Sequence, residues 1–216
     1  MKERRQFLKA ALGLLAGAGI FLPSFLSTRR PFRGEEQNSA SSKKVSRENL
    51  THMDPAKVDT SNLEITPLKD FQTMGSTGYK VDREKWRLEV TGRVKKQLSL
   101  TYPQILDLPC AEKAVLLICP GFFANHGLWK GILMSELLKR AEAEDGAAQV
   151  IFCSREGEYE RNEKFSTTEV LGNQVFLAYG VNKETLPEKH GFPLRVVAEG
   201  HYGSRWLKYV SLIKVE

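Results

Sequence analysis

Cys119 stands where an apolar segment meets a turn, and a thiolate in such a position can bind a soft metal ion. The segment before it, residues 115–118, is Val-Leu-Leu-Ile, and Pro120 and Gly121 follow it. Proline disfavours the helical conformation of the residue before it, and glycine permits a sharp turn, so we expect Cys119 at the end of a strand. A small cysteine buried in the core is the alternative interpretation of the same residues.

A basic cluster near the end of the chain could bind a phosphate group. It consists of His190 and Arg195 and, a few residues later, Arg205 and Lys208. Arginine binds phosphate oxygens through paired hydrogen bonds, and lysine adds a point charge. An ordinary solvated cluster of charges beside two strands is the alternative interpretation.

Several familiar catalytic patterns are absent from the sequence. The three cysteines form no Cys-x-x-Cys pair and the four histidines show no His-Glu-x-x-His spacing, which disfavours a zinc site and a c-type haem. Walker-type loops, Gly-x-Gly-x-x-Gly and Gly-x-Ser-x-Gly are absent as well. Whether Cys110 and Cys153 form a disulfide is open at this point.

The elements that must position these residues are mostly strands. Alternating or continuous apolar runs predict strands at 86–92, 114–118, 149–153, 175–179, 194–197 and 209–215. Helical patterns are short and predict turns of helix within 99–108, at 132–143 and from Ser166, where Ser-Thr-Thr-Glu has the spacing of a capping box. Strands and helices do not alternate regularly, so the pattern predicts an α+β fold rather than a doubly wound sheet.

The N-terminus is typical of an export signal. Arg4 and Arg5 are followed by Gln-Phe-Leu-Lys, the twin-arginine pattern. The apolar stretch 10–26 contains Pro23 and three glycines and is shorter than the ~20 strongly apolar residues of a spanning helix. We therefore expect residues 1–33 to be a twin-arginine signal, with an uncleaved membrane anchor as the alternative. That route carries folded proteins and favours a periplasmic or other extracytoplasmic protein that carries a redox cofactor.

The net charge of +6 belongs to the N-terminal segment and not to the folded part. Residues 1–50 contain ten basic and four acidic residues, whereas 51–216 contain 22 of each sign. A basic face on the folded domain, which nucleic-acid binding requires, is therefore not indicated. Residues 34–62 are rich in Glu, Ser, Asn and Lys and are expected to form a flexible linker. One domain is expected over 63–216.

The order of motifs resembles the molybdopterin-binding domain of the sulfite oxidase family, and in layout the exported bacterial single-domain members. The resemblance covers roughly residues 64–216 and is carried by the following motifs: Trp86-x-Leu-x-Val-x-Gly92, Leu108-Pro109, the strand ending at Cys119, Trp129-x-Gly131, Leu177-Ala-Tyr179, Asn182-x-x-x-Leu-Pro187, His190-Gly-Phe-Pro-Leu-Arg195 and Tyr202-Gly-x-Arg205-x-x-Lys208. The run from His190 to Lys208 is its most specific part. The resemblance implies the strand-rich α+β fold of that family.

The resemblance also implies a cofactor and its ligands. The cofactor is a molybdenum–molybdopterin with a single pterin, and Cys119 is its metal ligand and catalytic residue. The residues implied to bind the cofactor are His190, Arg195, Ser204, Arg205, Lys208, Ser76, Thr77, Tyr79 and Ser154. The residues expected around the substrate are Phe122, Asn125, His126 and Tyr159. The implied reaction is the transfer of one oxygen atom to or from a small substrate.

One departure from the family bears on the substrate. Sulfite-oxidising members hold their anion with arginines near the metal, but after Cys119 no arginine occurs before Arg140. Phe122 and Phe123 favour a neutral substrate such as a sulfoxide. Because the chain has no haem motif, we expect a separate electron-transfer partner, a membrane haem or quinone-linked subunit. The alternative function is a non-catalytic accessory or binding module that keeps the fold.

Overall fold

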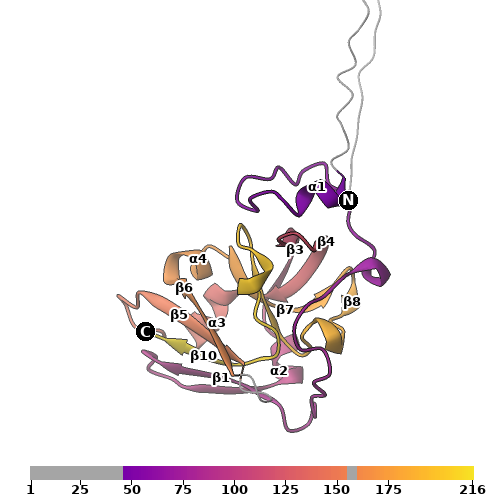
Figure 1. The fold of residues 1–216 in the computed structure, drawn as a ribbon. Helices are drawn as coiled ribbons and strands as arrows, with labels where there is room; N and C mark the ends of the chain where they lie inside the picture. Colours follow the sequence, from indigo (N-terminus) through magenta and orange to yellow (C-terminus); the bar gives the residue numbers. More distant parts are fainter. Residues whose placement is uncertain (1–45, 155–159) are drawn as a thin grey trace, which may run out of the picture. The chain divides into compact units, whose positions relative to one another are not determined.

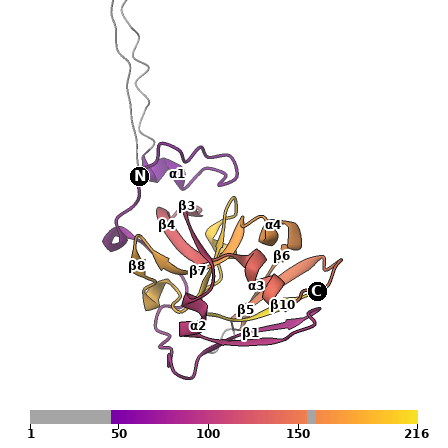
Figure 2. The same ribbon diagram turned by 180° about the vertical axis from the view of Figure 1, so that it is seen from behind.

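Strands form most of the regular structure in this computed structural model, which describes residues 46–154 and 160–216. Figure 1 and the reverse view in Figure 2 show two groups of strands facing each other. The first sheet has the order β2–β1–β10–β5–β6, with bounds Leu98–Thr101, Arg87–Gly92, Val210–Val215, Gln149–Ser154 and Arg161–Ser166. In the second sheet β3, β4, β7 and β8 follow one another, with bounds Cys110–Cys119, Phe123–Ile132, Val175–Val181 and Glu184–Thr185, and β9 (Arg195–Ala198) pairs with β7.

The helices of the described residues are short and lie at connections. Their bounds are Arg47–Leu50 for α1, Tyr102–Leu106 for α2, Met134–Arg140 for α3 and Thr167–Leu171 for α4, with 3₁₀ turns at Leu68–Asp70, Glu188–His190 and Gly203–Arg205. Capping boxes start α2 at Thr101 and α4 at Ser166, as the sequence predicts for α4. The predicted α+β class is confirmed, since strands dominate and do not alternate regularly with helices.

A shared hydrophobic core fills the space between the sheets. Leu88 and Phe152 from the first sheet and Trp129 and Leu177 from the second belong to one buried cluster, and each is fully or almost fully buried. The indole nitrogen of Trp129 donates a hydrogen bond to the carbonyl oxygen of Val115 (3.1 Å), so its one polar atom is satisfied within the core.

The longest hairpin, β3–β4, fixes which side chains face the core. The sequence predicted only 114–118 as a strand here, whereas β3 spans ten residues and β4 follows after a three-residue turn. Leu117 pairs with Asn125 and Leu116 pairs with His126. Because side chains alternate between the faces of a strand, Asn125 lies on the side of Leu117 and Cys119, and His126 lies on the opposite side.

Residues 46–62, the described part of the predicted linker, pack on that opposite side of the hairpin. Leu50 is buried with Leu116, Ile118 and Ala124, and the amide of Gly121 donates to the carbonyl oxygen of Thr51 (3.1 Å). A flexible linker over this part was therefore a wrong expectation. Residues 1–45 lie outside the described part, and with them the predicted signal or anchor and the rest of the linker. No helix among the described residues is long and apolar enough to cross a bilayer.

Candidate cofactor-binding site

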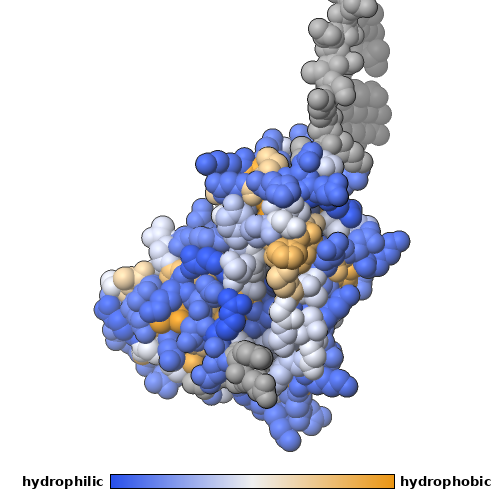
Figure 3. All heavy atoms as spheres, in the orientation of Figure 1, coloured by the Kyte–Doolittle hydropathy of each residue, from blue (hydrophilic) through white to orange (hydrophobic). Residues whose placement is uncertain are grey.

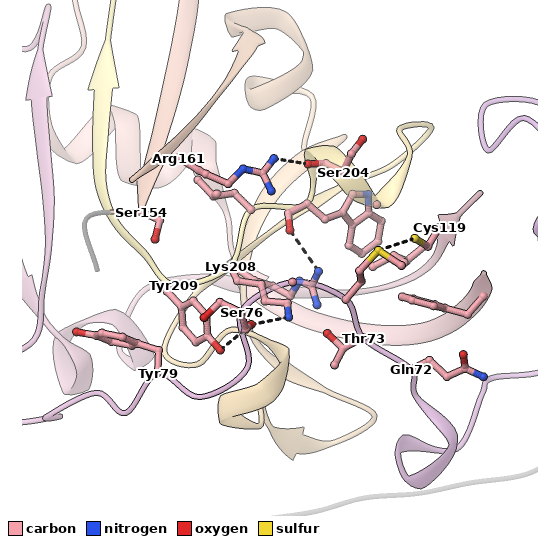
Figure 4. Close-up of a pocket in the computed structure, with 18 of the residues that line it drawn as sticks. Gln72, Thr73, Ser76, Tyr79, Cys119, Ser154, Arg161, Ser204, Lys208 and Tyr209 are labelled. Carbon is pink, nitrogen blue, oxygen red and sulfur yellow. Dashed lines mark hydrogen bonds between the residues drawn. The ribbon is translucent and has the colours of Figure 1, made fainter. Parts of the chain in front are cut away.

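A cavity of about 990 Å³ opens beside the end of β3. Most of its lining comes from segment 72–79, from residues 117–123 where β3 turns into β4, and from residues 203–209. Ser154, Glu160, Arg161 and Arg195 complete the lining among the described residues. Figure 4 shows Cys119 on one side of the cavity and Ser154 and Tyr79 on the other. Segments more than a hundred residues apart in the sequence therefore meet at one site.

Cys119 is the last residue of β3 and lines the cavity. It is partly buried, and its Sγ lies 3.9 Å from the Sδ of Met74. Burial raises the pKa of this thiol. A metal ion favours the thiolate and would reverse that effect, because a coordinating thiol is deprotonated. The three cysteines are all thiols, with Cys110 exposed on β3 and Cys153 buried on β5.

Arg195 supplies a buried positive charge to the cavity. Its guanidinium donates to the carbonyl oxygens of His190 (3.1 Å) and Trp206 (3.3 Å) and lies 5.3 Å and 5.7 Å from the ring centres of Trp129 and Trp206. Its Nε is buried without a hydrogen-bond partner among the described residues. Burial lowers the pKa of Arg195 to about 10. A buried cation with an unused donor is well suited to bind an anion.

Lys208 supplies a second charge to the same cavity. Its Nζ donates to the carbonyl oxygens of Ser76 and Lys189, at 3.0 Å each. Burial, and then the charge of Arg195, lower the pKa of Lys208 to about 8. None of the described carboxylates forms an ion pair with Lys208 or with Arg195. Within the described part of the chain the two cations thus have no counter-ion, which favours an anionic ligand.

The charge state of Lys208 should make anion binding depend on pH. In the anion-free protein its pKa is about 8, and an anion beside the ammonium group raises that value. Below that pH the lysine is charged with or without the anion. Above it, binding must take up a proton, so affinity is expected to fall by up to about tenfold per pH unit. Calorimetric titration with inorganic phosphate from about pH 7 to about pH 9.5 measures this slope.

Lys208→Arg is the matched control for that measurement. Arginine stays protonated over the whole range, so the variant is expected to bind phosphate with no slope above pH 8. If the variant kept the slope of the wild-type protein, another group would be responsible.

Segment 72–79 is held against the cavity at both ends. The side chain of Asn125 donates to the carbonyl oxygen of Gln72 (2.8 Å) and accepts from its amide (3.2 Å). Toward the other end, the hydroxyl of Tyr209 and the ammonium of Lys208 donate to the carbonyl oxygen of Ser76. Asn125 therefore supports the wall of the cavity without lining it.

Removing the amide of Asn125 should loosen this wall. Asn125→Ala loses two partly buried hydrogen bonds, each contributing about 0.5–1.5 kcal/mol, so we expect about 1–3 kcal/mol less unfolding free energy. Faster hydrogen exchange is expected over residues 72–79. Gln72→Ala is the control, because both bonds use the backbone of Gln72. If the two variants showed equal hydrogen exchange over residues 72–79, the side chain of Asn125 would not hold this segment in place.

The other predicted site residues divide into two groups. Ser76, Tyr79, Ser154 and Ser204 line the cavity together with Cys119, Arg195 and Lys208. His190 lies behind it: burial lowers its pKa to about 4, and its carbonyl oxygen holds Arg195. The remaining predicted residues within the described part do not line the cavity, and they are Thr77, Phe122, Asn125, His126 and Arg205. Tyr159 lies outside the described residues.

Local structure explains these positions. Phe122 lies in the β3–β4 turn and is 67% exposed. His126 is buried, and its Nδ1 lies 3.1 Å from the carbonyl oxygen of Leu63. Arg205 lies over the ring of Phe165 (4.2 Å) and pairs with Glu163 (3.4 Å).

Arg161 on β6 lines the cavity and was not predicted from the sequence. Its guanidinium donates to the carbonyl oxygen of Ser204 (2.9 Å) and to the carboxylate of Glu163 (3.0 Å). Figure 4 shows the contact between Arg161 and Ser204. The sequence around Arg161 has no motif that marks it, and only the pairing of β5 with β6 brings it to Ser154.

The cavity fits the cofactor that the resemblance implies. Molybdopterin carries a phosphate, and Arg195 and Lys208 offer two cations without carboxylate partners among the described residues. The buried Nε of Arg195 has no hydrogen-bond partner among the described residues, and serine hydroxyls line the wall. The thiol of Cys119 is a soft sulfur group of the kind that molybdenum accepts as a ligand. Charge, unused donors and volume therefore agree with a phosphorylated pterin and a thiolate-bound metal.

Two known reductases are similar to this chain in sequence. A nitrate reductase of Brassica napus is 30% identical over 182 residues, 70% of this chain and 20% of that protein. The catalytic subunit of a protein-methionine-sulfoxide reductase of Gluconobacter oxydans is 30% identical over 145 residues, 60% of this chain and 46% of that protein. The chain thus spans about a fifth of the first relative and less than half of the second.

A solved structure and a family description complete the comparison. The sulfane dehydrogenase SoxCD of Paracoccus pantotrophus has a similar fold, with a TM-score of 0.64 at 21% identity, over 76% of this chain and 46% of that chain. The family described as "Oxidoreductase molybdopterin binding domain" matches residues 74–216, which include every described residue of the cavity except Gln72 and Thr73. The chain therefore belongs to the family of oxidoreductase molybdopterin-binding domains, whose cofactor is molybdenum–molybdopterin.

Proposed function

We propose that this protein transfers an oxygen atom to or from a small uncharged substrate, with a sulfoxide as the first candidate, and that Cys119 ligates the molybdenum. The observation that carries the proposal is the meeting of the Cys119 thiol with Arg195 and Lys208 in one cavity. A cysteine buried as a core residue would not need to share a cavity with two cations that have no carboxylate partner among the described residues. The sulfoxide is supported by the similarity to the protein-methionine-sulfoxide reductase of Gluconobacter oxydans.

In this proposal the cofactor is held at two ends. Arg195 and Lys208 would bind its phosphate, and Cys119 would bind its metal. The hydroxyls of Ser76, Ser154 and Ser204 line the space between. When bound, the cofactor supplies the two-electron redox change that accompanies oxygen transfer.

The residues that line the cavity would orient the cofactor and keep water away from one side of it. The indole ring of Trp206 and the side chain of Leu207 are buried and line the cavity, so one wall is apolar. Arg195 is fixed between two tryptophan rings and two carbonyl oxygens, which holds its charge in one place before any ligand arrives. Such fixed charges favour binding because little reorganisation is required.

The overall reaction needs a source of electrons. A sulfoxide takes up two electrons and two protons, its S–O bond breaks, and a thioether and water are released. We propose that the electrons come from a separate partner, a membrane haem or quinone-linked subunit. We also propose export by the twin-arginine route or retention by an N-terminal anchor, on the basis of Arg4 and Arg5.

The test is the composition and activity of the purified full chain. Protein made in a host that synthesises the cofactor is expected to contain about one molybdenum and one pterin per chain. It is also expected to reduce a neutral sulfoxide with a reduced viologen dye as electron donor. Folded protein that binds phosphate but contains no molybdenum or pterin would overturn the proposal and favour a non-catalytic binding module.

A further inference from the structure

Met74 is the side chain in contact with the cavity-facing thiol. Its Sδ lies 3.9 Å from the Sγ of Cys119, and the residue lines the cavity although it is 49% exposed. Figure 4 shows the dashed contact between the two sulfur atoms. Met74 therefore contacts both solvent and the proposed metal ligand.

The position of Met74 is determined by the ends of its segment. Asn125 binds the backbone of Gln72, two residues before it. Lys208 and Tyr209 bind the carbonyl oxygen of Ser76, two residues after it. These anchors hold the backbone of Met74 at the cavity wall, so its side chain contributes to the surface that lines the cavity.

In the proposed function, the cations that line the described part of the cavity serve the cofactor phosphate or other groups of the protein rather than the substrate. Among the described residues, its charged lining consists of Glu160, Arg161, Arg195 and Lys208. Arg161 is bound to Ser204 and Glu163, and the other two cations are bound to carbonyl oxygens. Around Cys119, the lining side chains of Leu117, Pro120 and Phe123 carry no charge.

From this arrangement we propose that Met74 is a specificity-determining residue that selects an uncharged, sulfur-containing substrate over an oxyanion. The inference deepens the proposed function and rests on it. A thioether has no hydrogen-bond donor for an anion and would leave its oxygens desolvated without compensation. It is polarisable and packs well against another sulfur or an apolar group. A cation at position 74 would favour an oxyanion over an uncharged substrate, because its charge would lie beside Cys119, the proposed metal ligand.

Thiol alkylation tests the local charge without any cofactor. Full-length protein made in a host that lacks the cofactor, in a Cys110→Ser background, is treated with iodoacetamide, which is neutral, and with iodoacetate, which is anionic. Rates at Cys119 are measured by mass spectrometry. Both reagents react with the same thiolate, so the ratio of the two rates does not depend on how much of the thiol is ionised. The ratio therefore reports the electrostatic potential at Cys119. Relative to wild type, Met74→Arg is expected to raise the iodoacetate-to-iodoacetamide ratio about threefold and Met74→Glu to lower it about threefold, as for unit charges ~6 Å apart in water.

Two control variants bracket this measurement. Met74→Leu keeps the size and neutrality of the side chain, so its ratio is expected to match wild type. Leu171→Arg adds the same charge at an exposed position on α4 and is expected to change the ratio little. If both charged variants at position 74 left the ratio unchanged, Met74 would not face the thiol and the inference would be wrong.

Loaded enzyme then separates the inference from the proposed function. In Met74→Arg we expect the KM for a neutral sulfoxide to rise about tenfold or more, with new inhibition by sulfite or sulfate, because a cation prefers the oxyanion. Met74→Leu is expected to keep the wild-type KM within about threefold. Wild-type holoenzyme without any oxygen-transfer activity would refute the proposed function. Active wild type with an unchanged KM and no anion inhibition in Met74→Arg would refute only the role of Met74.

Discussion

Replacing Cys119 with serine is expected to remove the bound molybdenum and the oxygen-transfer activity of the purified protein. A serine hydroxyl is a hard, weakly acidic ligand, whereas the site requires a soft thiolate. Losing an outer-sphere partner of a metal ligand already costs about 10–100-fold in affinity or activity, and losing the protein's own ligand is expected to cost more. Molybdenum by plasma mass spectrometry and turnover with a neutral sulfoxide measure the two losses.

The cofactor-free stability of Cys119→Ser should change little. Cys119 is only partly buried and ends β3 next to an exposed turn, so the change from sulfur to oxygen leaves the core intact. Cys110→Ser at the other end of the same strand is the matched control and is expected to keep both metal and activity. A Cys119→Ser protein that retained molybdenum and turnover would exclude a ligand role for this residue.

The sequence was sufficient for the strand that carries Cys119, but not for its partner. Residues 123–132 contain Asn125, His126 and two glycines, which are poor strand formers, so their residue types do not predict β4. Tertiary contacts decide the case. A Cβ on Gly131 would lie 2.3 Å from the carbonyl oxygen of Leu177, and one on Gly127 would lie 2.8 Å from the ring of Phe71. Glycine is required at these two positions because neighbouring residues approach the backbone closely, and the sequence alone does not show these contacts.

Missing β4 also explains two misplaced pocket residues. The sequence pattern alone places both Asn125 and His126 around the substrate. As neighbours on a strand they point to opposite faces. Asn125 therefore hydrogen-bonds to the backbone of Gln72, whereas the ring of His126 contacts the backbone carbonyl of Leu63. A one-residue offset on a strand changes the surface that a side chain serves.

Composition was a poor guide to residues 46–62. Few large apolar residues occur there, yet one of them, Leu50, is buried to 3% exposure beside Ile118. The segment gains order from a surface already formed by β3 and β4, together with the backbone bond to Gly121. Arg161 shows the same limit within the site, because pairing between distant strands places it.

Replacing Arg195 with methionine is expected to abolish retention of the cofactor while changing the cofactor-free fold only modestly. Leaving the buried phosphate without its charged partner costs about 2–5 kcal/mol, which is roughly 30-fold or more in affinity. The fold loses two hydrogen bonds to the carbonyl oxygens of His190 and Trp206. It also no longer has to bury an unpaired charge, which acts in the opposite direction. We therefore expect the Tm of the cofactor-free protein to move by no more than about 2–4 °C, equivalent to about 1 kcal/mol.

Arg205→Met distinguishes the geometry of the cavity from the spacing of the sequence motif. The motif assigns both arginines to the cofactor, but Arg205 pairs with Glu163 and lies over Phe165. The geometry therefore predicts that Arg205→Met retains pterin after gel filtration and binds inorganic phosphate like wild type, while Arg195→Met does neither. If both variants lost pterin and phosphate binding equally, Arg205 would bind the cofactor as the sequence motif predicts, although it does not line the cavity. If Arg195→Met alone retained them, the buried cation would not be the phosphate anchor.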